Sequence, residues 1–247
     1  MSIILAEDSI IFNEINYNSA DSLFPKDWVE LYNVTTEPIN IGNWIFKDDN
    51  DEHEFIIPDN YKLIGQPGLK LILNNQSSIL SYSNIEFIGN KYNPITISSE
   101  DFTGQGIIIF NSNKKSIFKN VIFDKLSNPK YYGWNLTGVI TTYHSKIEIY
   151  DSIFKNNQSE DYINFIDSEF IVNNSSFNNI YSDGIDSDYS NGNVVDTNFN
   201  NTGNDAIDLS GSKIYIKNVF INSVGDKGLS VGERSTLYGK NIHLINN

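Results

Sequence analysis

The sequence contains no cysteine, one methionine and one arginine among its 247 residues. The absence of cysteine excludes disulfides and thiolate metal sites, so nothing in the chain indicates its redox compartment. Arg234 is the only guanidinium group, which argues against recognition of phosphate or uronate, because an arginine fork is the usual means of binding them. No apolar run reaches the roughly 18 residues of a membrane-spanning helix.

Positive charge is also scarce, since 17 basic residues face 31 acidic ones and the net charge is −14. Nucleic acids and anionic membranes require a basic face, so we expect neither as a partner. The N-terminus, MSIILAEDSI, lacks the basic region and the long apolar stretch of a signal peptide. Acidic β-proteins rich in Asn and Ser are often secreted. We therefore expect an extracellular or cell-surface protein whose export signal is not in this chain, with an intracellular protein as the alternative.

The residues that are abundant favour strands. The chain has 14 Tyr and 15 Phe, and its hydrophobic fraction of 39% is rich in Ile and poor in Ala and Leu. No long segment repeats apolar residues at helical spacing. An all-β fold is therefore predicted.

A repeat of about 22 residues dominates the C-terminal part and predicts a right-handed parallel β-helix. Successive coils lie about 4.8 Å apart, so equivalent positions stack and bury one another. Upstream, Phe87 and Phe123 are the expected inward aromatics. Two columns carry the prediction: Ile163, Ile185, Ile207 and Leu229; and Phe154, Phe177, Phe199 and Phe220, with His243 as a packed imidazole in the last slot.

Asparagine recurs two residues after each aromatic, at Asn156, Asn179, Asn201 and Asn222. Stacked amides can hydrogen-bond from coil to coil in a ladder. The alternative is that Asn is simply abundant and favours turns. We expect the ladder.

An insertion interrupts the repeat at residues 127–138, where Phe123 and Phe154 are farther apart than one coil. Insertions on solenoids lie on one face, which is often the binding face. Tyr131, Tyr132 and Trp134 in this insertion could stack on sugar rings, or they could pin the insertion to the solenoid. The sequence does not decide between these two roles.

Residues 63–247 resemble the pectate-lyase-like (pectin lyase-like) parallel β-helix proteins. The segments PGLKLIL, KKSIFKNVIFDKL, DGIDSD and NDAIDLSGS carry this resemblance. It implies the fold and not the activity, because the architecture hosts lyases, hydrolases, epimerases, adhesins and structural spikes.

Residues 9–62 are similar to the first half of a bacterial lamin-tail domain, through WVELYN and the following GNW. The resemblance implies an immunoglobulin-like, extracytoplasmic module with no catalytic role. We expect two regions, a module at 1–62 and a β-helix at 63–247. The module is either a truncated sandwich or a cap on the open end of the solenoid, where an uncovered edge would pair with other chains.

Acidic residues also recur at the coil spacing. The predicted metal ligands are Asp183, Asp186, Asp205 and Asp208, because a cation would relieve the repulsion between carboxylates one coil apart. Calcium is the expected cation, because it prefers carboxylate and carbonyl oxygen ligands. The alternative, which we favour, is a solvated acidic face without a cofactor.

We expect a non-catalytic surface or secreted solenoid that acts as a scaffold or as a glycan-binding wall. The rival is a polysaccharide lyase or glycoside hydrolase in which Asp186 and Asp208 supply acids and Arg234 or Lys227 the base. The sequence stops within a coil, at LINN, so we expect an incomplete β-helix that self-associates through its open C-terminal coil.

Overall fold

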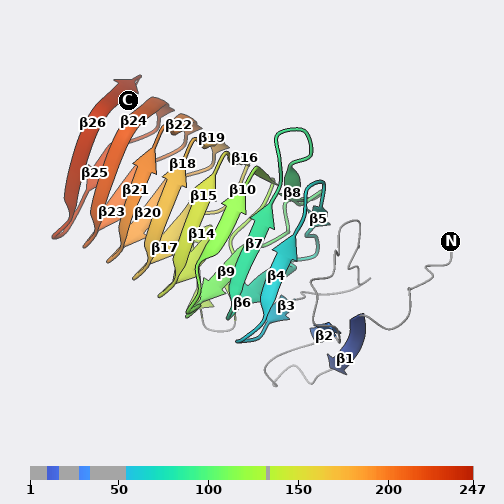
Figure 1. Ribbon diagram of the computed structural model, residues 1–247. Coiled ribbons are helices and arrows are strands. Elements are labelled where there is room, and N and C mark those ends of the chain that lie inside the picture. The colour runs from blue at the N-terminus through green and yellow to red at the C-terminus, as the bar shows by residue number, and fades with distance from the viewer. Residues whose placement is uncertain (1–9, 17–27, 34–53, 132–133, 247) are drawn as a thin grey trace.

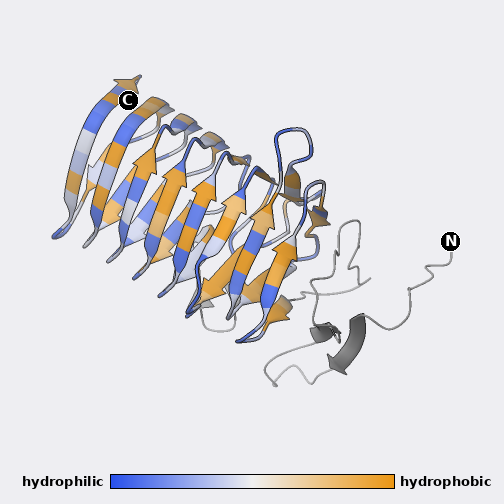
Figure 2. Ribbon diagram, viewed as in Figure 1, coloured by the Kyte–Doolittle hydropathy of each residue, from blue (hydrophilic) through white to orange (hydrophobic). Residues whose placement is uncertain are grey.

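The computed structural model describes residues 10–16, 28–33, 54–131 and 134–246, and all their regular elements are strands (Figure 1). The strands stack along one axis and form two long, mostly parallel sheets. Apolar and polar residues alternate along many of the strands (Figure 2), as expected when one face of a sheet lies on the core. The predicted all-β parallel β-helix is confirmed.

Sheet A has ten strands and contributes one strand to each coil. Its strands, in spatial order, are β1 (Ile10–Asn16), β2 (Trp28–Asn33), β3 (Glu54–Ile57), β6 (Ser78–Ser81), β9 (Ile107–Phe110), β14 (Gly138–Tyr143), β17 (Asp161–Ile166), β20 (Asp183–Asp188), β23 (Ile207–Ser210) and β25 (Leu229–Val231).

Sheet B has fourteen strands in two rows, which the long strand β24 (Lys213–Val224) joins. The first row holds β4 (Lys62–Gly65), β7 (Asn84–Ile88), β10 (Ser116–Lys119), β15 (Lys146–Tyr150), β18 (Glu169–Asn173) and β21 (Asn191–Val195). The second row holds β5 (Lys70–Ile72), β8 (Ile95–Ser98), β11 (Val121–Asp124), β16 (Ile153–Lys155), β19 (Ser176–Ile180) and β22 (Asn198–Thr202). Strand β26 (Thr236–Ile245) pairs with β24.

The core contains the predicted stacks. Ile163, Ile185, Ile207 and Leu229 pair in register along sheet A. The rings of Phe154, Phe177 and Phe199 stack with centroids 4.6 and 4.5 Å apart, and all three are fully buried. Phe87 and Phe123 are also fully buried, as predicted. Every coil thus buries its apolar residues against the next one.

The prediction that Phe220 follows Phe199 in the core column is wrong. Ile221, not Phe220, pairs with Phe199, so the regular step of 22 residues continues into β24. Phe220 lies between the buried Val219 and Ile221 and points outward, with 39% of its surface exposed. His243 pairs with Phe220 and is exposed, so it is not a packed core imidazole.

The asparagine ladder is present for three of its four predicted members. The side-chain amide of Asn179 donates to Oδ1 of Asn156 at 3.3 Å, and that of Asn201 donates to Oδ1 of Asn179 at 3.0 Å. All three have positive φ, a conformation that Asn tolerates at tight corners. Asn222 belongs elsewhere, because its amide donates to Oδ1 of Asn200.

A serine ladder at the corner between sheets A and B was not foreseen. The backbone N–H of Ser168 donates to Oγ of Ser190 at 2.9 Å, and the N–H of Ser190 donates to Oγ of Ser212 at 2.9 Å. Each serine follows a residue with positive φ, such as Asp167 or Tyr189. The hydroxyls therefore satisfy buried amides at the point where the strands stop pairing directly.

The insertion lies outside the regular coils, as predicted. Phe123 and Phe154 pair in register although the insertion separates them. Two short antiparallel strands, β12 (Lys130–Tyr131) and β13 (Trp134–Asn135), form a hairpin between β11 and β14.

The coils begin upstream of the boundary expected at residue 63. Strand β3 pairs in parallel with β6 from Glu54 to Ile57. Strands β1 and β2 pair antiparallel and continue sheet A through the pair Trp28–Glu54. They therefore stand at the N-terminal end of the sheet, the place that a cap of the solenoid would occupy.

Candidate functional site

The outer face of sheet A carries the predicted acidic columns. Asn164, Asp186, Asp208 and Ser230 pair in register on β17, β20, β23 and β25. Asp186 and Asp208 are half-buried, whereas their neighbours Ile185 and Ile207 are buried in the core. The carboxyls therefore point away from the core, as the alternation of strands requires.

Two of the aspartates support the backbone at the edge of this face. The N–H of Asp205 donates to Oδ1 of Asp183, and the N–H of Lys227 donates to Oδ1 of Asp205, both at 2.7 Å. The ammonium group of Lys227 lies 3.7 Å from Oδ2 of Asp205 and also pairs with Asp226. Repetition of Asp at this position thus has a structural role that needs no ligand.

Burial raises the pKa of several carboxyls in the cluster. Desolvation, followed by repulsion from Asp161 and the other aspartates, raises the pKa of Asp186 to about 8. Desolvation raises the pKa of Asp161 to about 7, with Asp183 adding repulsion and a hydrogen bond from Thr137 opposing it. Asp161 is 2% exposed, and its Oδ2 atom has no hydrogen-bond partner. The cluster therefore holds protons near neutral pH.

The predicted calcium ligands do not assemble into a visible metal centre. Over residues 54–131 and 134–246, no three His, Cys, Asp or Glu side chains are grouped as a metal ion requires. Asp183 and Asp205 direct one oxygen each to a backbone amide. Calcium binding by Asp183, Asp186, Asp205 and Asp208 thus stays a prediction.

The residues of the hypothetical catalytic set lie on successive coils. Asp186 and Asp208 are register partners on adjacent strands. Arg234 lies beyond β25, at a corner with positive φ, and is exposed. In the part of the chain that the structure describes, no hydrogen bond or ion pair joins Arg234 to either aspartate. Catalysis by Asp186, Asp208 and Arg234 therefore stays a prediction.

The aromatic residues of the insertion are only partly placed. Tyr131 and Trp134 are backbone partners in the β12–β13 hairpin, and Tyr132 lies outside the described residues. Their stacking on a sugar stays a prediction.

An aromatic row on the outer face of sheet A was missed. The ring centroids of Tyr82 and Phe110 are 5.9 Å apart, and those of Phe110 and Tyr143 are 4.9 Å apart in a stacked arrangement. The coils to which these residues belong carry extra loop residues, so no constant spacing marks the row in the sequence. The row ends where the acidic columns begin, because Tyr143 pairs with Ile166 and Ile166 with Asp188.

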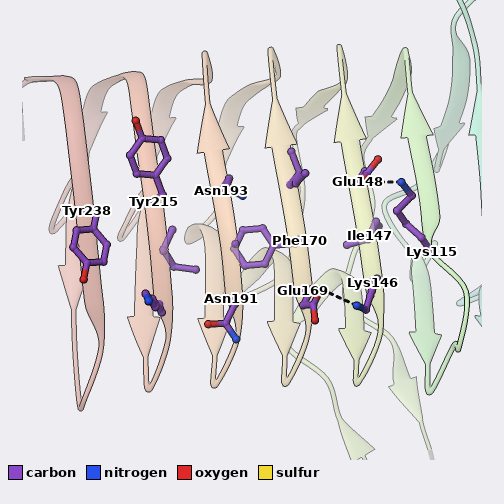
Figure 3. Close-up of a pocket in the computed structure, with 14 residues that line it drawn as sticks. Lys115, Lys146, Ile147, Glu148, Glu169, Phe170, Asn191, Asn193, Tyr215 and Tyr238 are labelled. Atoms are coloured by element: carbon purple, nitrogen blue, oxygen red, sulfur yellow. Dashed lines mark ion pairs between the residues drawn. The ribbon is translucent and has the colours of Figure 1, made fainter.

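A groove of about 470 Å³ follows the outer face of sheet B across β10, β15, β18, β21, β24 and β26 (Figure 3). Gly192 lies at an inward position of β21, where a Cβ atom would lie 2.5 Å from the ring of Phe170, so the lack of a side chain makes room for that ring in the core. The ring of Phe170 in turn stacks on Phe165 of sheet A at 3.8 Å. Gly192 therefore serves the packing of the core, and the side chains that border the groove are the outward ones of the neighbouring strands.

The walls of the groove combine planar polar groups with aromatic rings. Asn193, Tyr215 and Tyr238 pair in register on successive strands, with Asn191 beside them. Tyr215 is 39% and Tyr238 55% exposed. Such aromatic rings and amides bind sugars well, because rings cover apolar sugar faces and amides bond hydroxyls.

The charged side chains differ between the two ends of the groove. At one end Lys115 pairs with Glu148 at 2.8 Å and Lys146 with Glu169 at 2.9 Å (Figure 3). At the other end no carboxylate faces outward from β21, β24 and the matching part of β26. The outward residues there are Asn191, Asn193, Val195, Lys213, Tyr215, Lys217, Thr236, Tyr238 and Lys240.

Comparison with known proteins identifies the N-terminal part. Residues 5–122, just under half of the chain, match the lamin tail domain family model. The lamin tail match extends beyond residues 9–62, which carried the resemblance in the sequence, and reaches β11 of the β-helix. Within it β1 and β2 are antiparallel, while the residues from Glu54 on form parallel coils. No significant match was found among curated protein sequences.

Solved structures with similar folds share little sequence with the chain. A proposed glycosyl hydrolase from Parabacteroides merdae has 15% identity and a TM-score of 0.41 over 72% of this chain and 81% of its own. A pectate lyase from Acidovorax avenae subsp citrulli has 11% identity and a TM-score of 0.29 over 78% and 56%. The fluoroquinolone resistance protein QnrB1 has 14% identity and a TM-score of 0.21 over 75% and 91%. At these values the likenesses concern the solenoid fold alone. In the described part of the chain, no helix has the length and apolarity needed to cross a membrane.

Proposed function

We propose that the protein is a non-catalytic, extracellular or cell-surface solenoid that binds a glycan in the groove of sheet B. The observation that carries this proposal is the register row Asn193, Tyr215 and Tyr238, whose side chains border the groove. Neighbouring strands lie about 4.8 Å apart, so the row offers repeated contacts to a linear polymer lying across the coils.

The groove is suited to binding rather than to reaction. Its carboxylates, Glu148 and Glu169, each pair with a lysine at 2.8 or 2.9 Å. Both carboxylates of the groove therefore already have an ionic partner in its wall. The exposed rings of Tyr215 and Tyr238 can cover sugar surface.

Retention on immobilised polysaccharides tests the proposal. The 247-residue chain should be retarded by at least one polymer of a panel that includes neutral, uronate and amino-sugar polymers. The double variant Tyr215→Ala, Tyr238→Ala should lose that retardation. The control is Tyr92→Ala, Tyr181→Ala, since these two rings are 88% and 69% exposed but lie outside the groove. Equal retention of both double variants would refute the proposal.

A second candidate function is cleavage of a polysaccharide on sheet A. The observation that favours it is the pKa of Asp186, which burial raises to about 8, so that this carboxyl is protonated at neutral pH and could act as a general acid. Turnover of the same polymers, with and without calcium, tests it. Activity that Asp186→Asn abolishes while groove variants retain it would establish sheet A as the functional face.

A further inference from the structure

The last coils of the solenoid carry opposite charges on two outer faces. The outward residues of sheet A there include Asp188 and Asp208, whereas those of sheet B include Lys213, Lys217 and Lys240. Phe165 of sheet A and Phe170 of sheet B stack against each other in the core at 3.8 Å. The outer faces of the two sheets therefore point away from each other.

Neither set of charges is neutralised within its own face. In the described part of the chain, no ion pair involves Asp188 or Asp208, and none involves Lys213, Lys217 or Lys240. Lys213 instead lies over the ring of Tyr238, 5.9 Å from its centroid. Among the aspartates, repulsion from Asp208 helps to raise the pKa of Asp188, after burial. An approaching cationic surface would relieve this repulsion.

We propose that the acidic outer face of sheet A in one copy docks on the Lys217–Lys240 side of sheet B in a second copy. A second copy is the occupant that complements both faces at once. Its charges also have the right spacing, because both rows rise by one strand separation, about 4.8 Å, per coil. The contact is heterologous and leaves one face of each kind free, so it extends into rows of parallel solenoids.

This association goes beyond glycan binding and can be separated from it. Lys217 and Lys240 do not line the groove, whereas Tyr215 and Tyr238 do. Reversal of the two lysines therefore tests docking, and removal of the two tyrosines tests glycan binding. A glycan that fills the groove should compete with docking, because Tyr238 and Lys240 project from the same strand.

Sedimentation velocity in about 0.1 M and about 1 M salt tests the docking. The Debye length falls from about 10 Å to about 3 Å between these conditions. The parent should form dimers and larger species in the first and become monomeric in the second. Association through the open edge of the terminal coil would behave oppositely, since screening of the net charge of −14 favours it.

Charge exchange identifies the faces. The double variant Lys217→Glu, Lys240→Glu should be monomeric alone. The double variant Asp188→Lys, Asp208→Lys should also be monomeric alone, whereas an equimolar mixture of the two should associate again. If the second variant does not fold, Asp188→Asn, Asp208→Asn replaces it and should also be monomeric. A parent that is monomeric in 0.1 M salt, a mixture that does not associate, or association that persists in either single variant or in 1 M salt would overturn the proposal.

Discussion

The side-chain amide of Asn164 donates a hydrogen bond to Oδ2 of Asp186 at 2.9 Å, from one coil to the next on the outer face of sheet A. A second bond from the same amide reaches Oδ2 of Asp188 at 3.3 Å. One neutral side chain thus bridges two carboxyls that lack a cationic partner among the described residues. The solenoid tolerates their repulsion by holding protons, because the pKa of Asp186 is raised to about 8.

Stability should therefore fall as the pH rises. Asp161 and Asp186 have pKa values of about 7 and about 8 in the folded chain, against about 4 in an unfolded one. Between pH 4 and 8 the folded state binds more protons, so the free energy of unfolding decreases with pH in this window. Asp186→Asn should stabilise the protein by roughly 1–3 kcal/mol at pH 8 and leave it unchanged near pH 4.

Chemical denaturation at both pH values measures this effect. Asp226→Asn is the control, because that carboxylate is largely exposed beside Lys227 and should give no such gain. If Asp186→Asn fails to stabilise the protein at pH 8, then the carboxyl is ionised and solvated in the folded state.

The corrected register of the aromatic column predicts unequal effects of two phenylalanine truncations. Phe199 is fully buried against Phe177, so Phe199→Ala should cost about 3–5 kcal/mol of unfolding free energy. Phe220 points outward, so Phe220→Ala should cost less than about 1 kcal/mol. Thermal melts of both variants decide the register, and the reverse order of stabilities would restore Phe220 to the core.

The asparagine ladder can be separated from the backbone conformation that it accompanies. Asn201 has a φ of 60° and donates to Asn179. Asn201→Gly removes the ladder bond but retains easy access to positive φ, whereas Asn201→Ala loses both. The glycine variant should lose about 0.5–1.5 kcal/mol, the usual net worth of one hydrogen bond, and the alanine variant more. Equal stability of parent and glycine variant would show that the ladder contributes nothing.

Calcium provides the test of the acidic columns as a metal site. A ligand that binds only the folded state raises its melting temperature. Because Asp183 and Asp205 already bind backbone amides, we expect millimolar calcium to shift the parent and Asp186→Asn, Asp208→Asn equally. A shift in the parent that the double variant lacks would establish a site at Asp186 and Asp208.

The repeat made most of the fold predictable from the sequence, because stacked positions such as Ile163, Ile185 and Ile207 must share their chemistry. The errors lie where the type of a residue suggests the wrong environment. Phe220 looks like a core aromatic, yet the alternation along β24 places Val219 and Ile221 inside. The parallel pairing of Glu54–Ile57 with Ser78–Ser81 lies upstream of the expected boundary at residue 63, and the step between these strands does not match the later repeat.

The candidate site was less predictable than the fold. The acidic columns were found because Asp recurs at the coil spacing, but their burial and raised pKa values depend on neighbours that no local pattern reveals. The groove arises from side chains on separate coils, such as Asn193, Tyr215 and Tyr238, which have no common motif. Residues that cooperate only across coils become visible once the register is known.

Hydrogen–deuterium exchange of the chain with and without a retained glycan tests the central claim most directly, because it locates the occupied face without a substitution. The account predicts slower exchange in β18, β21, β24 and β26, which line the groove, and no change in β17, β20 and β23 of sheet A. Protection confined to β17, β20 and β23 would contradict it and would place the functional surface on the acidic face.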